Sequence, residues 1–144
     1  MENERKINIF YADDTQILRK MGQRFLEGYN KELGLDINVL VFPDGKPLVD
    51  YLIENIKSIE SDLNIVILDG HMKELHGIDV VNTIIREKIN CIDLDNIFFL
   101  TAEEEEAIKP EIPKEVHIIE KKDWHELIVE IKGKIIKIIT MNWD

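Results

Sequence analysis

Short apolar runs recur along the chain and predict five buried β-strands. The runs are rich in isoleucine, valine, leucine and phenylalanine, with little of the polar alternation that a half-exposed strand would show. They cover Ile7–Ala12, Ile37–Phe42, Asn64–Leu68, Asn96–Leu100 and, more weakly, Val116–Ile119. Runs of this kind are typical of parallel strands that are covered on both faces.

Apolar residues at helical spacing follow most of these runs and predict helices. The first helix has Thr15 as its N-cap and can end at Gly34. The third begins after Gly77, and the last begins near Asp123 and is weakened by Gly133. The predicted apolar stripes are, in order, Ile17, Leu18, Met21, Phe25 and Leu26; Leu48, Leu52, Ile53 and Ile56; Ile78, Val81, Ile84 and Ile85; and Leu127, Ile128, Ile131, Ile135 and Ile138.

The segment 102–115 interrupts this alternation. It opens with four consecutive glutamates and then meets Pro110 and Pro113, and a proline cannot continue a helix. We expect one helical turn near Glu103–Ile108 and irregular chain after it, and a turn at Pro43-Asp44-Gly45. The order of strands and helices predicts an open, mostly parallel sheet with helices on both sides, in a single domain spanning residues 1–144.

Composition and charge limit the function. A chain of 144 residues with 44% hydrophobic residues suits one globular domain. Its net charge of −11 repels phosphate backbones and disfavours nucleic acid as a direct partner. The single cysteine, Cys91, excludes an intrachain disulfide and favours a cytoplasmic location. We expect no signal peptide and no membrane insertion, because no apolar run approaches the roughly 20 residues that span a bilayer.

Residues with reactive side chains follow four of the five predicted strands. They are Asp13 and Asp14 after the first strand, Asp69 after the third, Thr101 after the fourth, and Lys121 or its neighbour Lys122 after the fifth. Sites in parallel sheets form beyond the carboxyl ends of the strands, so the three carboxylates converge if the first and third strands are neighbours. Hard oxygen ligands in this number suit Mg²⁺. An acidic nucleophile, a metal pair, a hydroxyl and a cation are the parts that phosphoryl transfer requires.

Each of these residues also has an ordinary structural interpretation. Two aspartates after a strand commonly form a turn or a helix cap, a threonine commonly caps the next turn, and a lysine is commonly a solvated charge. The hypothesis therefore depends on their combination. His71 and His76 lie in the loop after Asp69, but their spacing is not diagnostic of zinc. We expect both to be exposed polar residues.

The combined pattern resembles the response-regulator receiver domains of two-component signalling. The most specific stretch is Leu-Asp-Gly-His-Met-Lys-Glu-Leu-His-Gly at 68–77, in which Met72 and Gly77 lie three and eight residues after Asp69. The resemblance covers nearly the whole chain. It implies a flavodoxin-like, doubly wound α/β fold with a five-stranded parallel sheet in the order 2-1-3-4-5 and helices on both faces. The fourth helix departs from the family, because Pro110 and Pro113 predict that it is short or irregular.

The resemblance also implies a role for each site residue. Asp69 would be phosphorylated by a sensor histidine kinase or a phosphotransfer protein. The Mg²⁺ ligands would be Asp13, Asp14, Asp69 and the main-chain carbonyl of His71. Thr101 would move towards the acyl phosphate and Lys121 would pair with it. The output would be contact with a downstream protein target, not enzymatic turnover, and a second copy of the chain is a candidate partner.

Several positions depart from the family pattern and define the alternatives. Lys73 and Lys122 stand where the family usually has proline, and Ile118 stands where it typically has an aromatic switch residue. The main alternative is therefore a receiver-like interaction module that acts without phosphorylation. A phosphatase of the haloacid-dehalogenase type is disfavoured because His71 replaces its usual second acid. A flavodoxin is disfavoured because the loops lack a Ser/Thr/Gly-rich phosphate cradle.

Overall fold

The computed structural model describes residues 6–34, 36–121 and 124–142, in which strands and helices alternate as predicted. The elements are β1 (Ile7–Ala12), α1 (Gln16–Leu33), β2 (Ile37–Phe42), α2 (Gly45–Glu54), α3 (Ile56–Ile59), β3 (Leu63–Asp69), α4 (Gly77–Arg86), the 3₁₀ turn η1 (Leu94–Asn96), β4 (Ile97–Thr101), α5 (Glu105–Ile108), the 3₁₀ turn η2 (Lys109–Glu111), β5 (His117–Glu120) and α6 (Trp124–Asn142). The strands form one all-parallel sheet in the order β2-β1-β3-β4-β5. The predicted fold class is confirmed.

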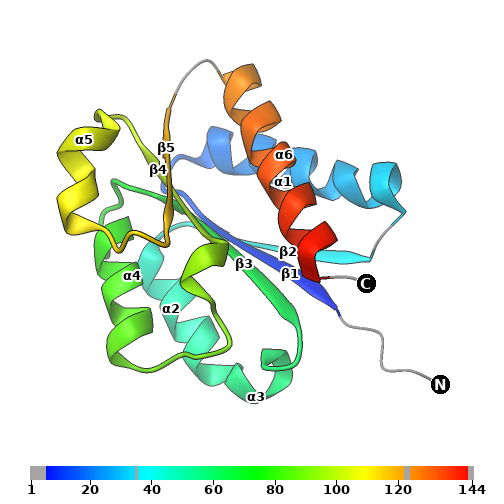
Figure 1. Ribbon diagram of the computed structural model, residues 1–144, viewed down its shortest axis with the longest axis horizontal. Helices are drawn as coiled ribbons and strands as arrows, with labels where there is room; N and C mark the ends of the chain where they lie inside the picture. Colours follow the sequence, from blue (N-terminus) through cyan, green and yellow to red (C-terminus); the bar gives the residue numbers. More distant parts are fainter. Residues whose placement is uncertain (1–5, 35, 122–123, 143–144) are drawn as a thin grey trace.

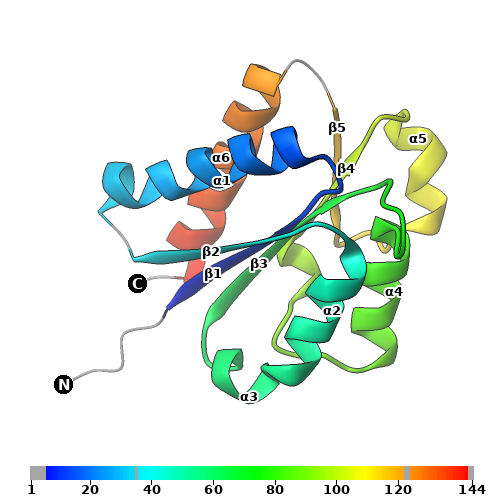
Figure 2. The ribbon, with the colours of Figure 1, turned by 180° about the vertical axis from the view of Figure 1, so that it is seen from behind.

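Helices cover both faces of the sheet (Figure 1). Helices α1 and α6 lie on one face, and α2, α3 and α4 lie on the other, where α2 and α4 run side by side (Figures 1 and 2). Alternate residues of β1 divide between the two layers: Ile9 and Tyr11 pack with α1 and α6, whereas Phe10 packs on the opposite face. Because successive side chains of a strand point to opposite faces, each strand contributes to two hydrophobic cores. This explains the continuous apolar runs.

The predicted helix stripes are partly wrong. Ile53 of α2 and Ile85 of α4 are 44% and 47% exposed, and Met21 is also exposed, whereas Val80, which lay outside the predicted stripe, is fully buried. Adjacent helix positions differ by about 100° around the axis, and Ile53 and Ile85 point away from the sheet next to the buried Leu52 and Ile84. The second predicted stripe is also divided, because α2 ends at Glu54 and the separate short α3 carries its last member.

The irregular segment before β5 agrees with its prediction. Helix α5 is a single turn of four residues, and the 3₁₀ turn η2, which contains Pro110, follows it directly. Ile108 and Ile112 are nonetheless buried in the core on the side of α2 and α4. Gly34 ends α1 as predicted, with a φ of +66° that glycine adopts without steric cost.

Three asparagines form an unpredicted polar row at the amino end of the sheet. Asn38, Asn8 and Asn64 are in register across β2, β1 and β3. The side-chain amide of Asn8 donates to the carbonyl oxygen of Asn64 at 2.9 Å and accepts from Asn38 at 3.2 Å. A buried asparagine without partners would be costly, so this row favours one register among the three strands.

In the described part of the chain, each helix is too short or too polar to cross a bilayer.

Candidate functional site

The strand order brings the predicted site residues to one edge of the sheet. Strands β1 and β3 are neighbours, with Ala12 opposite Leu68, so Asp13 follows β1 next to the end of β3. Asp69 is the last residue of β3 and Thr101 the last residue of β4. Parallel strands place their carboxyl ends at the same edge, and this order lets residues from four segments meet there.

Three carboxylates converge at this edge. One oxygen from each of Asp13, Asp14 and Asp69 lies within 4.8 Å of the others. Asp13 and Asp69 are only 1% and 3% exposed, and Asp14 is half-buried. Buried carboxylates this close repel one another unless a cation or hydrogen-bond donors compensate their charge. Hard oxygen donors in this arrangement fit a divalent cation such as Mg²⁺.

Hydrogen bonds hold the Asp13 carboxylate. The backbone amide of Thr15 donates to its Oδ1 at 2.8 Å, and the hydroxyl of Tyr11 donates to its Oδ2 at 2.8 Å. Burial raises the pKa of Asp13, and these two hydrogen bonds partly offset the rise. Burial also raises the pKa of the Tyr11 phenol, so this hydroxyl keeps its proton and acts as the donor.

Lys121 reaches the acidic group. Its Nζ lies 2.7 Å from Oδ1 of Asp69, and its backbone amide donates to the carbonyl of Thr101 at 2.7 Å. The second bond extends the pairing of β4 with β5 by one residue and places the lysine at the rim. Lys122, the other sequence candidate, lies outside the described residues. Because the Lys121 ammonium contacts a buried carboxylate, it balances part of the charge of the site.

Thr101 lies at the same rim, and its side chain caps the turn that follows β4. Its side chain is buried, and its Oγ1 accepts a hydrogen bond from the backbone amide of Glu103 at 2.9 Å. A hydroxyl that accepts one hydrogen bond still has its own hydrogen to donate. The capping role and the predicted contact with a phosphoryl oxygen are therefore compatible.

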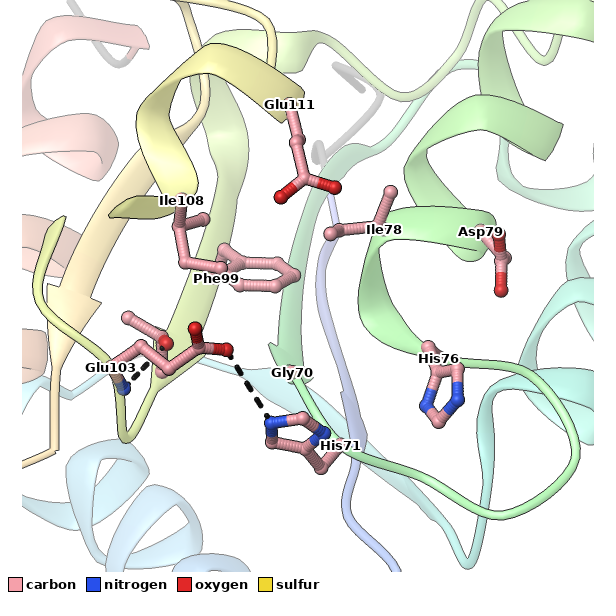
Figure 3. A pocket seen from close by; sticks show the side chains of 10 residues that line it. Gly70, His71, His76, Ile78, Asp79, Phe99, Glu103, Ile108 and Glu111 are labelled. Atoms are coloured by element: carbon pink, nitrogen blue, oxygen red, sulfur yellow. Dashed lines mark hydrogen bonds and ion pairs between the residues drawn. The ribbon is translucent and has the colours of Figure 1, made fainter. Parts of the chain in front are cut away.

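The two loop histidines are exposed, as predicted. Nε2 of His71 lies 3.6 Å from a carboxylate oxygen of Glu103, across the mouth of a cavity of about 310 Å³ between α4 and α5 (Figure 3). Nδ1 of His76 instead accepts a hydrogen bond from the backbone amide of Met72 at 3.2 Å. The centroids of the two imidazole rings lie 6.1 Å apart. Among the described residues, neither histidine belongs to a group of three or more metal-ligating side chains, so the structure does not support zinc at this loop.

Asp44 is a site-supporting residue that the sequence did not reveal. The predicted turn is the N-cap of α2, and its buried carboxylate accepts the amide of Gly45. The same carboxylate accepts the amides of Lys73, Glu74 and Leu75 at 2.9–3.0 Å. Burial alone would raise the pKa of Asp44, but these four N–H donors hold it below its ordinary value. Asp44 thereby fixes the loop that follows Asp69 and carries the carbonyl of His71.

Ile118 occupies the position where the resemblance implies an aromatic residue. It is partly buried on β5 and packs against the core on the side of α2 and α4. Phe99 of β4 lines the nearby cavity, in which Figure 3 shows its ring beside Ile108 of α5. Ile118 and the one-turn α5 thus stand where the resemblance implies an aromatic residue and a longer helix, whereas the acidic site has each residue type that the resemblance implies.

Comparisons with known proteins rest on structure. No protein-family model and no curated protein matches the sequence. Solved structures match over most of the chain. The receiver domain of the Francisella response regulator 1452 has 20% identity and a TM-score of 0.61, and the alignment covers 89% of this chain and 95% of that one. The Vibrio cholerae chemotaxis protein CheY4 has 16% identity and a TM-score of 0.65, with coverages of 90% and 98%.

A third solved structure gives the same result. A CheY-like receiver domain protein from Methanospirillum hungatei has 17% identity and a TM-score of 0.62, with coverages of 94% and 97%. Structural matches at such identities establish the fold only, so the chemistry has to be argued from the residues of the site. This chain has the fold of the response-regulator receiver domains, as the resemblance centred on residues 68–77 predicted.

Proposed function

We propose that this chain is a phosphoacceptor receiver that takes a phosphoryl group on Asp69. The observation that carries the proposal is the contact of Lys121 Nζ with Asp69 Oδ1 at 2.7 Å, inside a group of three converging carboxylates. A structural ion pair would need one carboxylate only. Two further acids beside it raise the electrostatic cost and suit a site that holds a cation and a phosphoryl group.

The reaction is a transfer between two side chains. An oxygen of Asp69 attacks the phosphorus of a phosphohistidine on a kinase or phosphotransfer protein. An O–P bond forms, the N–P bond of the donor breaks, and the released imidazole nitrogen takes up a proton from water. Lys121 balances negative charge on the acyl phosphate, and the Thr101 hydroxyl donates its free hydrogen to a phosphoryl oxygen.

The residues present fit Mg²⁺. Asp13, Asp14 and Asp69 offer carboxylate oxygens within 4.8 Å of one another, and the main-chain carbonyl of His71 would complete the protein ligands. The bound ion would neutralise charge on the phosphoryl oxygens. Asp44 supports the ion indirectly, since it orders the loop on which His71 lies.

The phosphorylation test uses the intact protein. Incubation with a small acyl-phosphate donor and Mg²⁺ should add the mass of one phosphoryl group, and chelation of the metal should prevent this. Asp69→Asn should give no adduct, whereas Asp79→Asn, an exposed acid on α4, should behave as wild type. An unmodified wild type, or an adduct that persists in Asp69→Asn, rules the proposal out.

Signal output is proposed to occur through protein contacts in the cytoplasm, with no direct role for nucleic acid and with a second copy of the chain as one candidate partner.

The alternative is an interaction module that acts without phosphorylation. The one-turn α5 and the isoleucine at 118 favour this alternative, because both alter the surface beside the site. Affinity capture of partners with wild type and with Asp69→Asn, each treated with the phosphoryl donor, separates the two. Identical partner sets support the alternative.

A further inference from the structure

Tyr11 makes a polar contact that the proposed chemistry does not use. Its hydroxyl donates to Oδ2 of Asp13 at 2.8 Å. The two residues are two positions apart at the carboxyl end of β1, so their side chains project to the same side of the chain. Tyr11 is 3% exposed and Asp13 is 1% exposed. A buried phenol needs a polar partner, and here that partner belongs to the acidic site.

Packing fixes the position of this hydroxyl. The Tyr11 ring lies against α1 at Gly22, where an added Cβ would come within 2.5 Å of the ring carbon Cε2. The glycine thus leaves the space that the ring fills. Leu26 and Ile67 belong to the same apolar wall. Because the ring is held on the side of α1 and α6, its hydroxyl is presented to Asp13 in one orientation.

The two donors to Asp13 restrict how this carboxylate can bind a cation. Oδ1 accepts the amide of Thr15 and Oδ2 accepts the phenol of Tyr11. Together they prevent rotation of the carboxylate plane. The phenol is neutral, so it supplies a hydrogen bond without removing the negative charge that attracts a cation. Each oxygen accepts one hydrogen bond and keeps a second lone-pair position, so the carboxylate meets a cation in one fixed orientation.

We infer that Tyr11 is a positioning residue that fixes the orientation of the Asp13 carboxylate and thereby favours Mg²⁺ over Ca²⁺. The inference rests on the proposed function, because it assumes that the three carboxylates bind a metal. Mg²⁺ demands a near-octahedral shell with short bonds, whereas Ca²⁺ accepts two-oxygen carboxylate ligands and a flexible geometry. A carboxylate of fixed orientation therefore benefits the ion with the stricter geometry, Mg²⁺, more than Ca²⁺.

The first test removes one oxygen atom. Tyr11→Phe keeps the ring in place and deletes the hydrogen bond. Calorimetric titration should show a loss of Mg²⁺ affinity of roughly tenfold, as for other residues that orient metal ligands, and a smaller loss for Ca²⁺. Tyr29→Phe is the matched control, because the Tyr29 hydroxyl is also buried in this layer but has no hydrogen-bond partner among the described residues. It should bind both ions as wild type does.

The second test separates positioning from simple stability. In Tyr11→Phe, phosphorylation by the small acyl-phosphate donor should need more Mg²⁺ for half-maximal rate and reach the wild-type rate at saturating Mg²⁺. The chain has three tyrosines and two tryptophans, so the double variant Tyr29→Phe, Tyr51→Phe is prepared with isotope-labelled tyrosine, and its labelled ring signal in nuclear magnetic resonance reports on Tyr11 alone. This tyrosine signal should shift on Mg²⁺ addition. This measurement stands even where Tyr11→Phe folds poorly.

The outcomes distinguish the inference from the function on which it rests. Unchanged Mg²⁺ and Ca²⁺ affinities in Tyr11→Phe, or a silent tyrosine signal in the double variant, overturn the role of Tyr11 and leave phosphorylation of Asp69 standing. A wild type that binds no Mg²⁺ overturns both. Reduced Mg²⁺ affinity with an unchanged maximal rate supports the inference.

Discussion

Asp44 shows how one buried side chain can order a distant segment. Its two carboxylate oxygens accept four backbone amides, one from the start of α2 and three from the loop after β3. A carboxylate has about four lone-pair positions, so Asp44 is close to fully used. Many side chains can accept a hydrogen bond from one backbone amide, but few can accept hydrogen bonds from all four of these amides at once. The geometry of the loop therefore depends on this residue.

Asp44→Ala should lower the free energy of unfolding by about 2–4 kcal/mol, because amides at a partly buried site lose their acceptor. Urea denaturation measures the effect. Asp50→Ala, which removes an exposed acid of α2 paired with Lys46, is the control and should change little. Equal stabilities of the two variants would contradict the role assigned to Asp44.

The lowered pKa of Asp44 predicts a pH dependence. A carboxyl with a lower pKa in the folded state stabilises the protein above the unfolded value of about 3.9. This contribution disappears as the pH falls through the folded pKa. Wild type should therefore lose stability below about pH 4 more steeply than Asp44→Asn. Parallel acid titrations followed by circular dichroism would reveal whether the two curves converge, and curves that stay parallel would contradict the prediction.

At the scale of elements, the helix glycines divide into two kinds that the sequence cannot separate. Gly28 of α1 and Gly133 of α6 have open space where a Cβ would lie, whereas Gly22 of α1 faces the ring of Tyr11. Glycine destabilises a helix interior relative to alanine by about 0.5–1 kcal/mol. The first two positions therefore weaken their helices without a packing benefit, and the third accommodates a buried ring beside the acidic site.

Gly28→Ala and Gly133→Ala should each raise the free energy of unfolding by about 0.5–1 kcal/mol. Gly22→Ala should lower it by about 1–3 kcal/mol, because the new methyl group overlaps the Tyr11 ring. Thermal denaturation of the three variants provides the comparison, and each serves as a control for the others. A change in the free energy of unfolding of the same sign at all three positions would show that helix propensity, and not the contact with Tyr11, determines the effect of Gly22→Ala.

At the scale of the whole molecule, the charge of −11 and the three converging carboxylates act in the same direction. Both favour binding of cations, but general attraction is screened by salt while specific coordination is not. A metal that binds only the folded state must also stabilise it.

Mg²⁺ should raise the melting temperature, with a stabilisation of about 1.4 kcal/mol at ten times its dissociation constant. Asp14→Asn should remove most of this effect, whereas Asp79→Asn should keep it. Sodium chloride at matched ionic strength is the control for general screening. Stabilisation by both salts to the same extent would show that no specific site exists.

The sequence by itself determined the alternation of strands and helices, the interrupted segment before β5, and the residue types at the strand ends. These features are local, because hydrophobic periodicity and proline act over a few residues. Asp13, Asp14, Asp69, Thr101 and Lys121 could be placed at one rim because every parallel strand brings its carboxyl end to the same edge.

Only the tertiary structure decided which side chains touch. The sequence did not reveal that Asp44 reaches the loop after Asp69, or that Tyr11 bonds to Asp13 in the space left by Gly22. It also did not show that the Lys121 ammonium directly contacts the Asp69 carboxylate. These contacts depend on the order of the strands and on the face of the sheet to which each side chain points. They also depend on how helices pack against strands that are distant from them in the sequence. Local patterns carry none of this information, so the chemistry of the site was predictable and its support was not.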